Sequence, residues 1–367
     1  MTVPTPGPTS RPTAAAASVP TAMPRDGHIA IAPIDPDDEA ALRAWLDVER
    51  SVQAHDRPHE PTRPWAEHRA RLAHPWPGEE TRAWLATASG EAVGALELTL
   101  PVLDNLDNAL VEITVDPAHR RRGVGGALLA HAIEEARSAG RRRIIAEAHE
   151  PLDDGAAPEV APGAAFLRAA GARKALADRR RRLTIPVPDE PALTTLESAA
   201  RERSVGYSVV RWAGPTPVEY LDDTARLTGR MSTDAPLDDL HWEPERYDAQ
   251  RIRRRDAAMR ARGIEQVAAA VREDASGRLV AFSVIGVHPE IGWHASQWDT
   301  IVDPPHRGMR LGALVKTANL GQLRARYPSV RALDTYNADS NPWMVSINEA
   351  MGFRPLDRLG EWELDLG

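Results

Sequence analysis

The 367-residue chain contains no cysteine and only two lysines, so 43 of its 45 basic residues are arginine. The absence of cysteine excludes disulfides, thiol catalysis and cysteine-based zinc sites. Because arginine is favoured throughout the chain, a run of arginines is weak evidence of function. The formal net charge of -8 gives no general attraction to nucleic acid or to anionic membranes.

Long apolar runs are also absent. No segment approaches the roughly 20 apolar residues of a membrane-spanning helix. The start of the chain is rich in Pro, Thr and Ala and lacks the charged and apolar regions of a signal peptide. We therefore predict a cytoplasmic protein without a membrane partner, with a disordered tail over residues 1–26.

One motif occurs twice in the chain. Residues 115–129 read VDPAHRRRGVGGALL, and residues 302–316 read VDPPHRGMRLGALVK. Each copy follows a short apolar run, turns at Asp-Pro and continues as an apolar helical pattern, which predicts a strand, a tight turn and a helix. The first amides of such a helix lack partners within it and, with the helix dipole, favour an anion. Glycines at that point allow a phosphate to approach the backbone.

A second feature repeats at the same interval. The hairpin signal Ala88-Ser89-Gly90 recurs as Ala275-Ser276-Gly277, and the distance along the chain between these copies equals the distance between the motif arginines Arg120 and Arg307. Equal spacing of two unrelated features indicates an internal duplication. We predict two tandem domains, residues 27–187 and 207–367, joined by a connector over residues 188–206.

The pattern R-x-x-G-x-G between a strand and a helix, preceded by V-x-P, resembles the acyl-CoA signature of the GNAT acetyltransferase superfamily. Arg120, Gly123 and Gly125 fill it completely. Arg307 and Gly312 fill it partly, because Arg310 replaces a glycine. A dinucleotide-binding fold is excluded, since it requires a further glycine at the position of Leu128 and glycines directly after the strand.

The resemblance implies a mixed α/β (α+β) chain with two GNAT-type domains, each a mostly antiparallel twisted sheet flanked by helices. It implies acetyl-CoA as co-substrate and no metal. In this superfamily the loop amides hold the CoA pyrophosphate, and the preceding strand pairs with pantetheine. The implied cofactor-binding residues are Val115, Arg120, Arg121, Arg122, Gly123, Val124, Gly125 and Gly126 in the first half, and Val302, Arg307, Gly308, Arg310 and Gly312 in the second.

The superfamily also favours an Asn eleven residues before the glycine of the last helix. This position is Asn341 in the second half and Val160 in the first. Arg310 could pair with a phosphate or fill the phosphate site. We therefore favour the first half for CoA, and leave open which half is catalytic.

GNAT enzymes transfer the acyl group by direct attack of an amine on the thioester, and a carboxylate on the strand before the motif often serves as base. Glu112 and Asp299 occupy matching positions, separated by the interval of the duplication. The alternative for both is an outward strand residue in solvent or in an ion pair. The usual thiolate acid is a Tyr four residues before the last helix's glycine, where this chain has Leu167 and Asn348. Tyr336 is therefore a candidate acid, although packing is its alternative role.

The acceptor is expected to be an amine on a small molecule or peptide. In the second half, Trp242 and Tyr247 are interleaved with six acidic residues that would attract a cation or simply be solvated: Asp234, Asp238, Asp239, Glu243, Glu245 and Asp248. In the first half, three histidines lack ligand spacing and are predicted to lie on the surface: His55, His59 and His68. The arginine runs 141–143, 179–182 and 253–255 are predicted to be solvated rather than to bind nucleic acid.

These features predict an acyl-CoA-dependent N-acyltransferase, and a homodimer is compatible with them. Two alternatives remain open. The first is a non-catalytic acyl-CoA-binding or regulatory protein, suggested by the missing tyrosines and by Arg310. The second is one catalytic unit joined to one scaffold unit.

Overall fold

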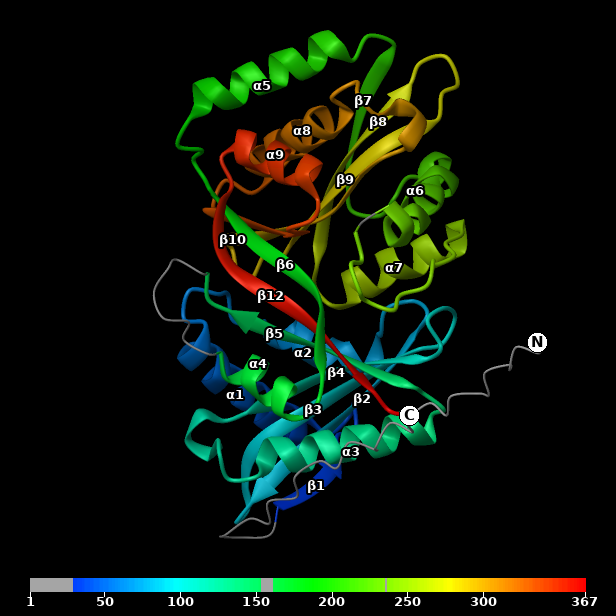
Figure 1. The fold of residues 1–367 in the computed structure, drawn as a ribbon. Coiled ribbons are helices and arrows are strands. Elements are labelled where there is room, and N and C mark those ends of the chain that lie inside the picture. Colours follow the sequence, from blue (N-terminus) through cyan, green and yellow to red (C-terminus); the bar gives the residue numbers. More distant parts are fainter. Residues whose placement is uncertain (1–28, 153–160, 235) are drawn as a thin grey trace, which may run out of the picture.

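The computed structural model describes residues 29–152, 161–234 and 236–367. The predicted tail over residues 1–26 and Val160 lie outside these residues. The described strands form a single twelve-stranded sheet in the order β1-β2-β3-β4-β5-β12-β6-β11-β10-β9-β8-β7 (Figure 1). The strands are β1 (Ile29–Pro33), β2 (Glu79–Ala88), β3 (Glu91–Pro101), β4 (Asn108–Val115), β5 (Arg143–Glu150), β6 (Arg173–Thr184), β7 (Tyr207–Ala213), β8 (Glu265–Glu273), β9 (Leu279–Val287), β10 (His294–Val302), β11 (Ala332–Ala338) and β12 (Arg354–Asp365).

The helices repeat in the same order in both halves. They are α1 (Glu39–Asp56), α2 (Trp65–Ala73), α3 (Val124–Ser138) and α4 (Pro162–Ala169), then α6 (Leu221–Asp234), α7 (Ala249–Ala261), α8 (Leu311–Arg326) and α9 (Pro342–Met351), with α5 (Glu190–Arg203) in the connector. In each half the motif helix follows a strand–turn unit, as predicted. None of the helices in the described ranges combines the length and apolar character needed to cross a membrane.

The two halves exchange their last strands. β12, at the end of the second half, lies between β5 and β6 and pairs antiparallel with both. β6, at the end of the first half, pairs with β11. β6 therefore extends from the first half into the second, and the two expected sheets are continuous.

The halves differ in how their motif helices are covered. In α3 the face predicted from the apolar spacing is buried, including Val124, Leu128 and Ala132. In α8 every residue from Leu311 to Leu320 is buried, because α5 packs against its outer side. Ser204, just after α5, donates a hydrogen bond to the carbonyl of Met309 in the second motif loop (3.1 Å). The connector therefore covers the second motif helix, and within the described residues no helix covers α3 in this way.

Candidate active site

The two motif loops have the same backbone conformation. Gly123 (φ 91°) and Arg310 (φ 56°) are the N-cap residues of α3 and α8, and both are left-handed. Two residues earlier, Arg121 (φ 63°) and Gly308 (φ 82°) are left-handed as well. Each loop thus places one glycine and one arginine in left-handed positions, and Arg310 fits the loop without changing its path.

The first arginine of each motif forms a hydrogen bond within its own loop. Arg120 Nε donates to the carbonyl of Val115 (3.2 Å), and Arg307 Nε donates to that of Val302 (3.3 Å). Their guanidinium groups pair with the last residue of α1 or α6: Arg120 with Asp56 (2.6 and 2.9 Å) and Arg307 with Asp234 (3.1 Å). Both arginines are thus engaged by the protein, whereas Arg121 and Arg122 are exposed beside the start of α3.

The second motif glycine has a packing role in both halves. A Cβ on Gly125 would lie 3.4 Å from the Phe166 ring on α4, and one on Gly312 would lie 3.0 Å from Ile347 on α9. A Cβ on Gly126 would meet nothing within 4 Å. Residues 125–127 are partly exposed, but residues 311–314 are buried. The first turn of α3 is therefore the more accessible anion site of the two.

Each half contains a parallel strand pair that separates near the motif. The paired residues of β4 and β5 end at Val111 and Ala146, and those of β10 and β11 end at Gln297 and Thr335. In β10 a register shift follows directly, between Gln297 and Thr300. Beyond these points the facing backbone groups of β4 and β10 are free of the neighbouring parallel strand. They are placed to pair with an extended ligand, as the resemblance implies.

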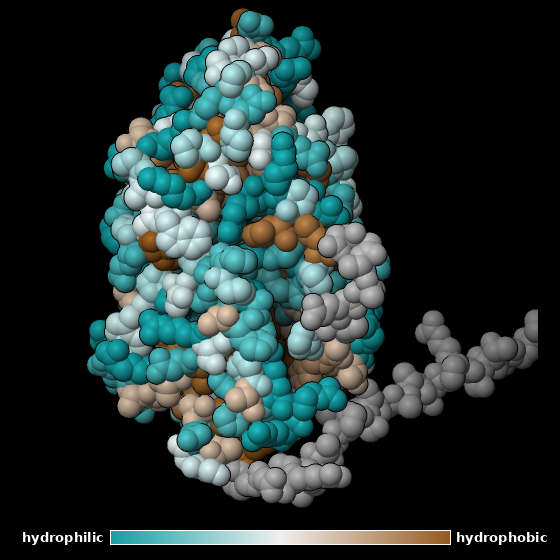
Figure 2. Space-filling view, turned by 90° about the vertical axis from the view of Figure 1, so that its left-hand side faces the viewer, coloured by the Kyte–Doolittle hydropathy of each residue, from teal (hydrophilic) through white to brown (hydrophobic). Residues whose placement is uncertain are grey.

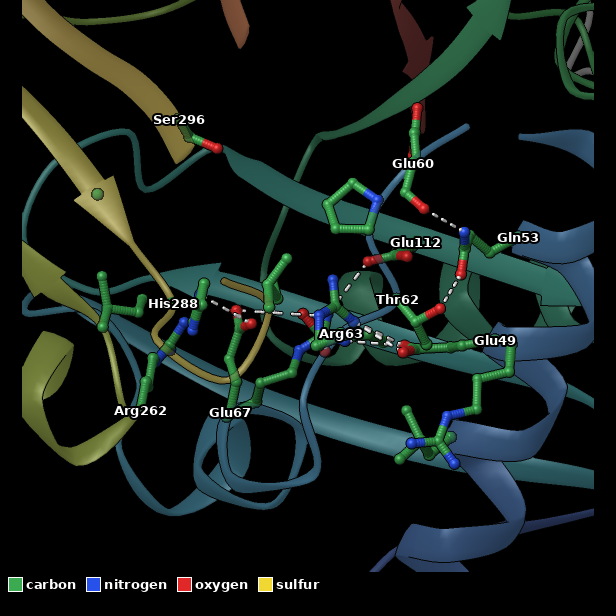
Figure 3. A pocket seen from close by; sticks show the side chains of 18 of the residues that line it. Glu49, Gln53, Glu60, Thr62, Arg63, Glu67, Glu112, Arg262, His288 and Ser296 are labelled. Atoms are coloured by element: carbon green, nitrogen blue, oxygen red, sulfur yellow. Dashed lines mark hydrogen bonds and ion pairs between the residues drawn. The ribbon is translucent and has the colours of Figure 1, made fainter. Parts of the chain in front are cut away.

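Two adjacent cavities lie between the halves, with volumes of about 460 and 780 Å³. Both are lined by Glu97, Glu112 and Trp298. Figure 3 shows the smaller cavity, with Glu49 and Arg63 of the first half on one side and His288 and Ser296 of the second half on the other. The larger cavity reaches the point where β4 and β5 separate, since residues 111–113 and 145–147 line it. On the outside of the molecule, hydrophilic and hydrophobic residues are interspersed over the face that Figure 2 presents.

Glu112 lies in a network of buried charge. Arg71 contacts Glu112 (3.1 Å), Glu97 (2.5 Å) and Glu49 (2.8 Å), and its own side chain is 7% exposed. The Glu112 side chain is 48% exposed and lines both cavities. Desolvation within the cavity walls and the nearby Glu49 raise the pKa of Glu112. A carboxylate with a raised pKa beside a substrate-sized cavity has the properties of a general base.

The structure brings Asp299 to the same place. Asp299 lines the larger cavity and pairs with Arg255 of α7 (3.4 Å). The two candidate bases, from different halves, therefore line one cavity. Tyr336 lies elsewhere: it is 40% exposed and opposite Arg180 in the sheet, outside the lining of both cavities.

The last helices provide no acid at the superfamily's usual position. Leu167 is in the core of the first half, and the fully buried Asn348 donates to the side-chain oxygen of Asn337 (2.5 Å). Asn341 is the N-cap residue of α9, and its side-chain oxygen accepts from the amide of Met344 (3.2 Å). Its role in this structure is to cap the helix.

Two expectations about polar residues require correction, and one open alternative can be narrowed. His68 is fully buried, because Nε2 bonds the Leu42 carbonyl (3.0 Å) and Nδ1 lies 3.3 Å from Glu49. Arg180 and Arg181 are also buried, since their run forms part of β6 in the middle of the sheet. The acidic loop of the second half is only partly solvated: Trp242, Glu245 and Tyr247 line the larger cavity.

One group in the described residues has the spacing of metal ligands. Glu60, His149 and Asp357 place one ligand atom each within 4.8 Å of the others. Arg57 lies 2.9 Å from His149, and Arg180 pairs with Glu60 (2.5 Å) and with Asp357. Burial and Arg57 lower the pKa of His149 to about 3, so the ring is neutral. Two guanidinium groups already neutralise this cluster, and a metal ion would have to displace them.

Replacing Arg71 by methionine should destabilise the fold by roughly 3–5 kcal/mol at pH 8, because three carboxylates would lose their shared cation. Protonation of these carboxylates relieves their repulsion in the folded state, so the folded variant binds more protons than its unfolded chain. The loss of stability should therefore be smaller at pH 5.5 than at pH 8. Denaturant unfolding at the two pH values measures both effects. An equal loss at both would show that only packing against Trp45 had been removed.

Comparison with known proteins agrees with this geometry. The model of the Acetyltransferase (GNAT) family matches residues 41–158. Residues 41–158 thus form a GNAT family domain, and the whole chain has the fold of a tandem GNAT protein. A solved tandem GNAT protein from the clavulanic acid biosynthesis pathway is 29% identical, with a TM-score of 0.79 over 93% of this chain and 99% of that one.

Two curated relatives carry the name mycothiol acetyltransferase. The protein from Gordonia bronchialis is 29% identical over 67% of this chain and 70% of its own length. The protein from Cellulomonas flavigena is 39% identical over 23% of this chain, and the match spans only 24% of that protein. Family and relatives together support an acetyltransferase.

Proposed function

We propose that the protein transfers the acetyl group of acetyl-CoA to a primary amine, and that the first half carries the reaction. One observation supports this above the others: β4 and β5 separate at an acidic cavity, and β4 leads from there to the motif loop and the accessible start of α3. The diphosphate would bind the first amides of α3, with Arg121 and Arg122 beside it. The acyl-carrying arm would pair with β4 beyond Val111.

The proposed chemistry is direct attack in a ternary complex. Glu112, directly or through a water, takes a proton from the ammonium group of the acceptor. The amine nitrogen then forms a bond to the acetyl carbonyl carbon, the carbon–sulfur bond breaks, and the thiolate of CoA takes up a proton. Backbone amides at the end of β4 would stabilise the oxyanion. Carboxylates lining both cavities attract the cationic form of the acceptor.

The test is release of free thiol from acetyl-CoA in the presence of a panel of small amines, aminoglycosides and peptides. We expect release that depends on the amine, with an N-acetylated product visible by mass spectrometry. Binding of acetyl-CoA without thiol release across the whole panel would instead support a non-catalytic, acyl-CoA-binding protein.

A further inference from the structure

The larger cavity contains two carboxylates that face each other and are bonded to no cation in the part of the chain that the structure describes. Glu147 on β5 and Glu361 on β12 are direct partners in the antiparallel pairing, so their side chains lie on the same face of the sheet. Both line the cavity, and neither forms an ion pair or hydrogen bond with a described residue. Desolvation, with Glu112 and Asp178 nearby, raises the pKa of Glu147 to about 7. Desolvation, with Glu147 and Asp178 nearby, raises the pKa of Glu361 to about 8.

The cations near this pair are engaged elsewhere. Arg251 pairs with Asp104 (2.6 Å) and Arg255 with Asp299 (3.4 Å). The other charged groups around the cavity and the pair are the carboxylates Glu79, Glu97, Glu112, Glu245 and Asp178, and Arg57, whose charge acts on Glu147. The cavity lining therefore has more carboxyl groups than cations, and Glu147 and Glu361 are a pair to which no described cation is bonded.

The opposite wall comes from the second half and suits an ammonium ligand. Trp242, Tyr247 and Trp298 line it, and aromatic faces attract ammonium groups. Thr228, on α6, also lines the cavity. It is 6% exposed, and its hydroxyl has no hydrogen-bond partner among the described residues. An unpaired buried hydroxyl is unfavourable unless a ligand or water completes it.

We propose that the Glu147–Glu361 pair binds a second ammonium group of the acceptor, so that the preferred acceptors are linear diamines and polyamines. The inference rests on the proposed function for the reactive amine, which lies at Glu112. Glu112 and Glu147 directly follow the last paired residues of β4 and β5. Because β4 and β5 separate beyond those residues, the two ammonium groups lie at least one strand spacing of about 4.8 Å apart, a distance that a methylene chain spans.

The kinetic test compares putrescine with butylamine, which has the same chain length and one amine fewer. The wild-type protein should prefer putrescine by at least tenfold in kcat/KM, and the double variant Glu147→Gln/Glu361→Gln should lose most of that preference. Glu91→Gln, an exposed change in the hairpin, is the control and should keep it. Equal use of both amines by the wild type, or an unchanged preference in the double variant, would overturn the inference.

Calorimetry separates this inference from the proposed function. Putrescine binding near pH 7.5 should release protons, because an ammonium group favours the ionised carboxylates, and titrations in phosphate and in Tris buffer measure that release. Putrescine binding to the wild type but not to the double variant, with no amine acetylated, would support the proposed ammonium site and contradict the proposed acetyltransferase function. Equal acetyl transfer to putrescine and butylamine, with no proton release on binding, would support the acetyltransferase function and contradict the proposed ammonium site.

Discussion

Replacing Gly123 by arginine is expected to reduce kcat/KM for acetyl-CoA by at least 100-fold, a loss of about 2.7 kcal/mol in transition-state stabilisation. Gly123 is the N-cap residue of α3, at the proposed diphosphate site. An arginine side chain there would occupy the space that the phosphate groups need. The substitution copies Arg310 of the second loop, which has the same left-handed conformation, so the variant should fold. Steady-state kinetics and acetyl-CoA titration measure the effect.

The reciprocal change, Arg310→Gly, is the matched control. We expect it to leave turnover within twofold and to stabilise the fold by about 1 kcal/mol, because glycine tolerates the left-handed region better than arginine. Thermal denaturation would confirm that both variants are folded. A gain of activity in Arg310→Gly would show that the second half also uses acetyl-CoA. A lower KM in Gly123→Arg would show that the arginine pairs with the phosphates rather than blocking them.

Features that depend on local chemistry could be predicted from the sequence. The hairpin at Ser89-Gly90 forms as expected, with both residues at positive φ. The repeat found in the sequence also extends to conformation, since the motif arginines bond equivalent carbonyls in both halves. Turn residues, helix caps and apolar periodicity act over a few residues, and this explains why these predictions succeed.

The exchange of β6 and β12 could not be predicted from the same signals. Alternating polar and apolar residues identify a strand and its two faces, but they do not identify its neighbours. The Glu147–Glu361 pair depends on this exchange, because Glu361 reaches β5 only when β12 lies beside it. Each carboxylate, taken alone, has the pattern of an ordinary solvated strand residue.

Buried charge escaped prediction for a related reason. His68 and Arg180 are buried because their partners Glu49, Glu60 and Asp357 come from other elements. A charged side chain is stable inside a protein only when such partners meet it, and only the tertiary structure brings them together. The expectation of solvated surface residues is sound for a single position and fails where two halves share an interface.

Replacing Glu112 by glutamine should lower kcat by roughly 10²–10⁴-fold, the usual contribution of general base catalysis. Glutamine retains the size of the side chain, and Arg71 retains its ion pairs with Glu49 and Glu97. The variant should therefore remain folded. Circular dichroism and acetyl-CoA affinity should be close to those of the wild type. A variant that binds acetyl-CoA normally but transfers slowly would place the defect in the chemical step.

The pH dependence gives the stricter test of Glu112. A base must be ionised, so wild-type kcat should rise with pH through the pKa of Glu112. Desolvation within the cavity walls and the nearby Glu49 raise that pKa above the usual carboxyl value of about 4.3. Glu112→Gln should remove this rising limb. Asp299→Asn is the matched variant from the second half. It should retain the rising limb of the pH profile, with at most a few-fold lower kcat. If Asp299→Asn removed the limb and Glu112→Gln kept it, the base would belong to the second half, although both side chains line the same cavity.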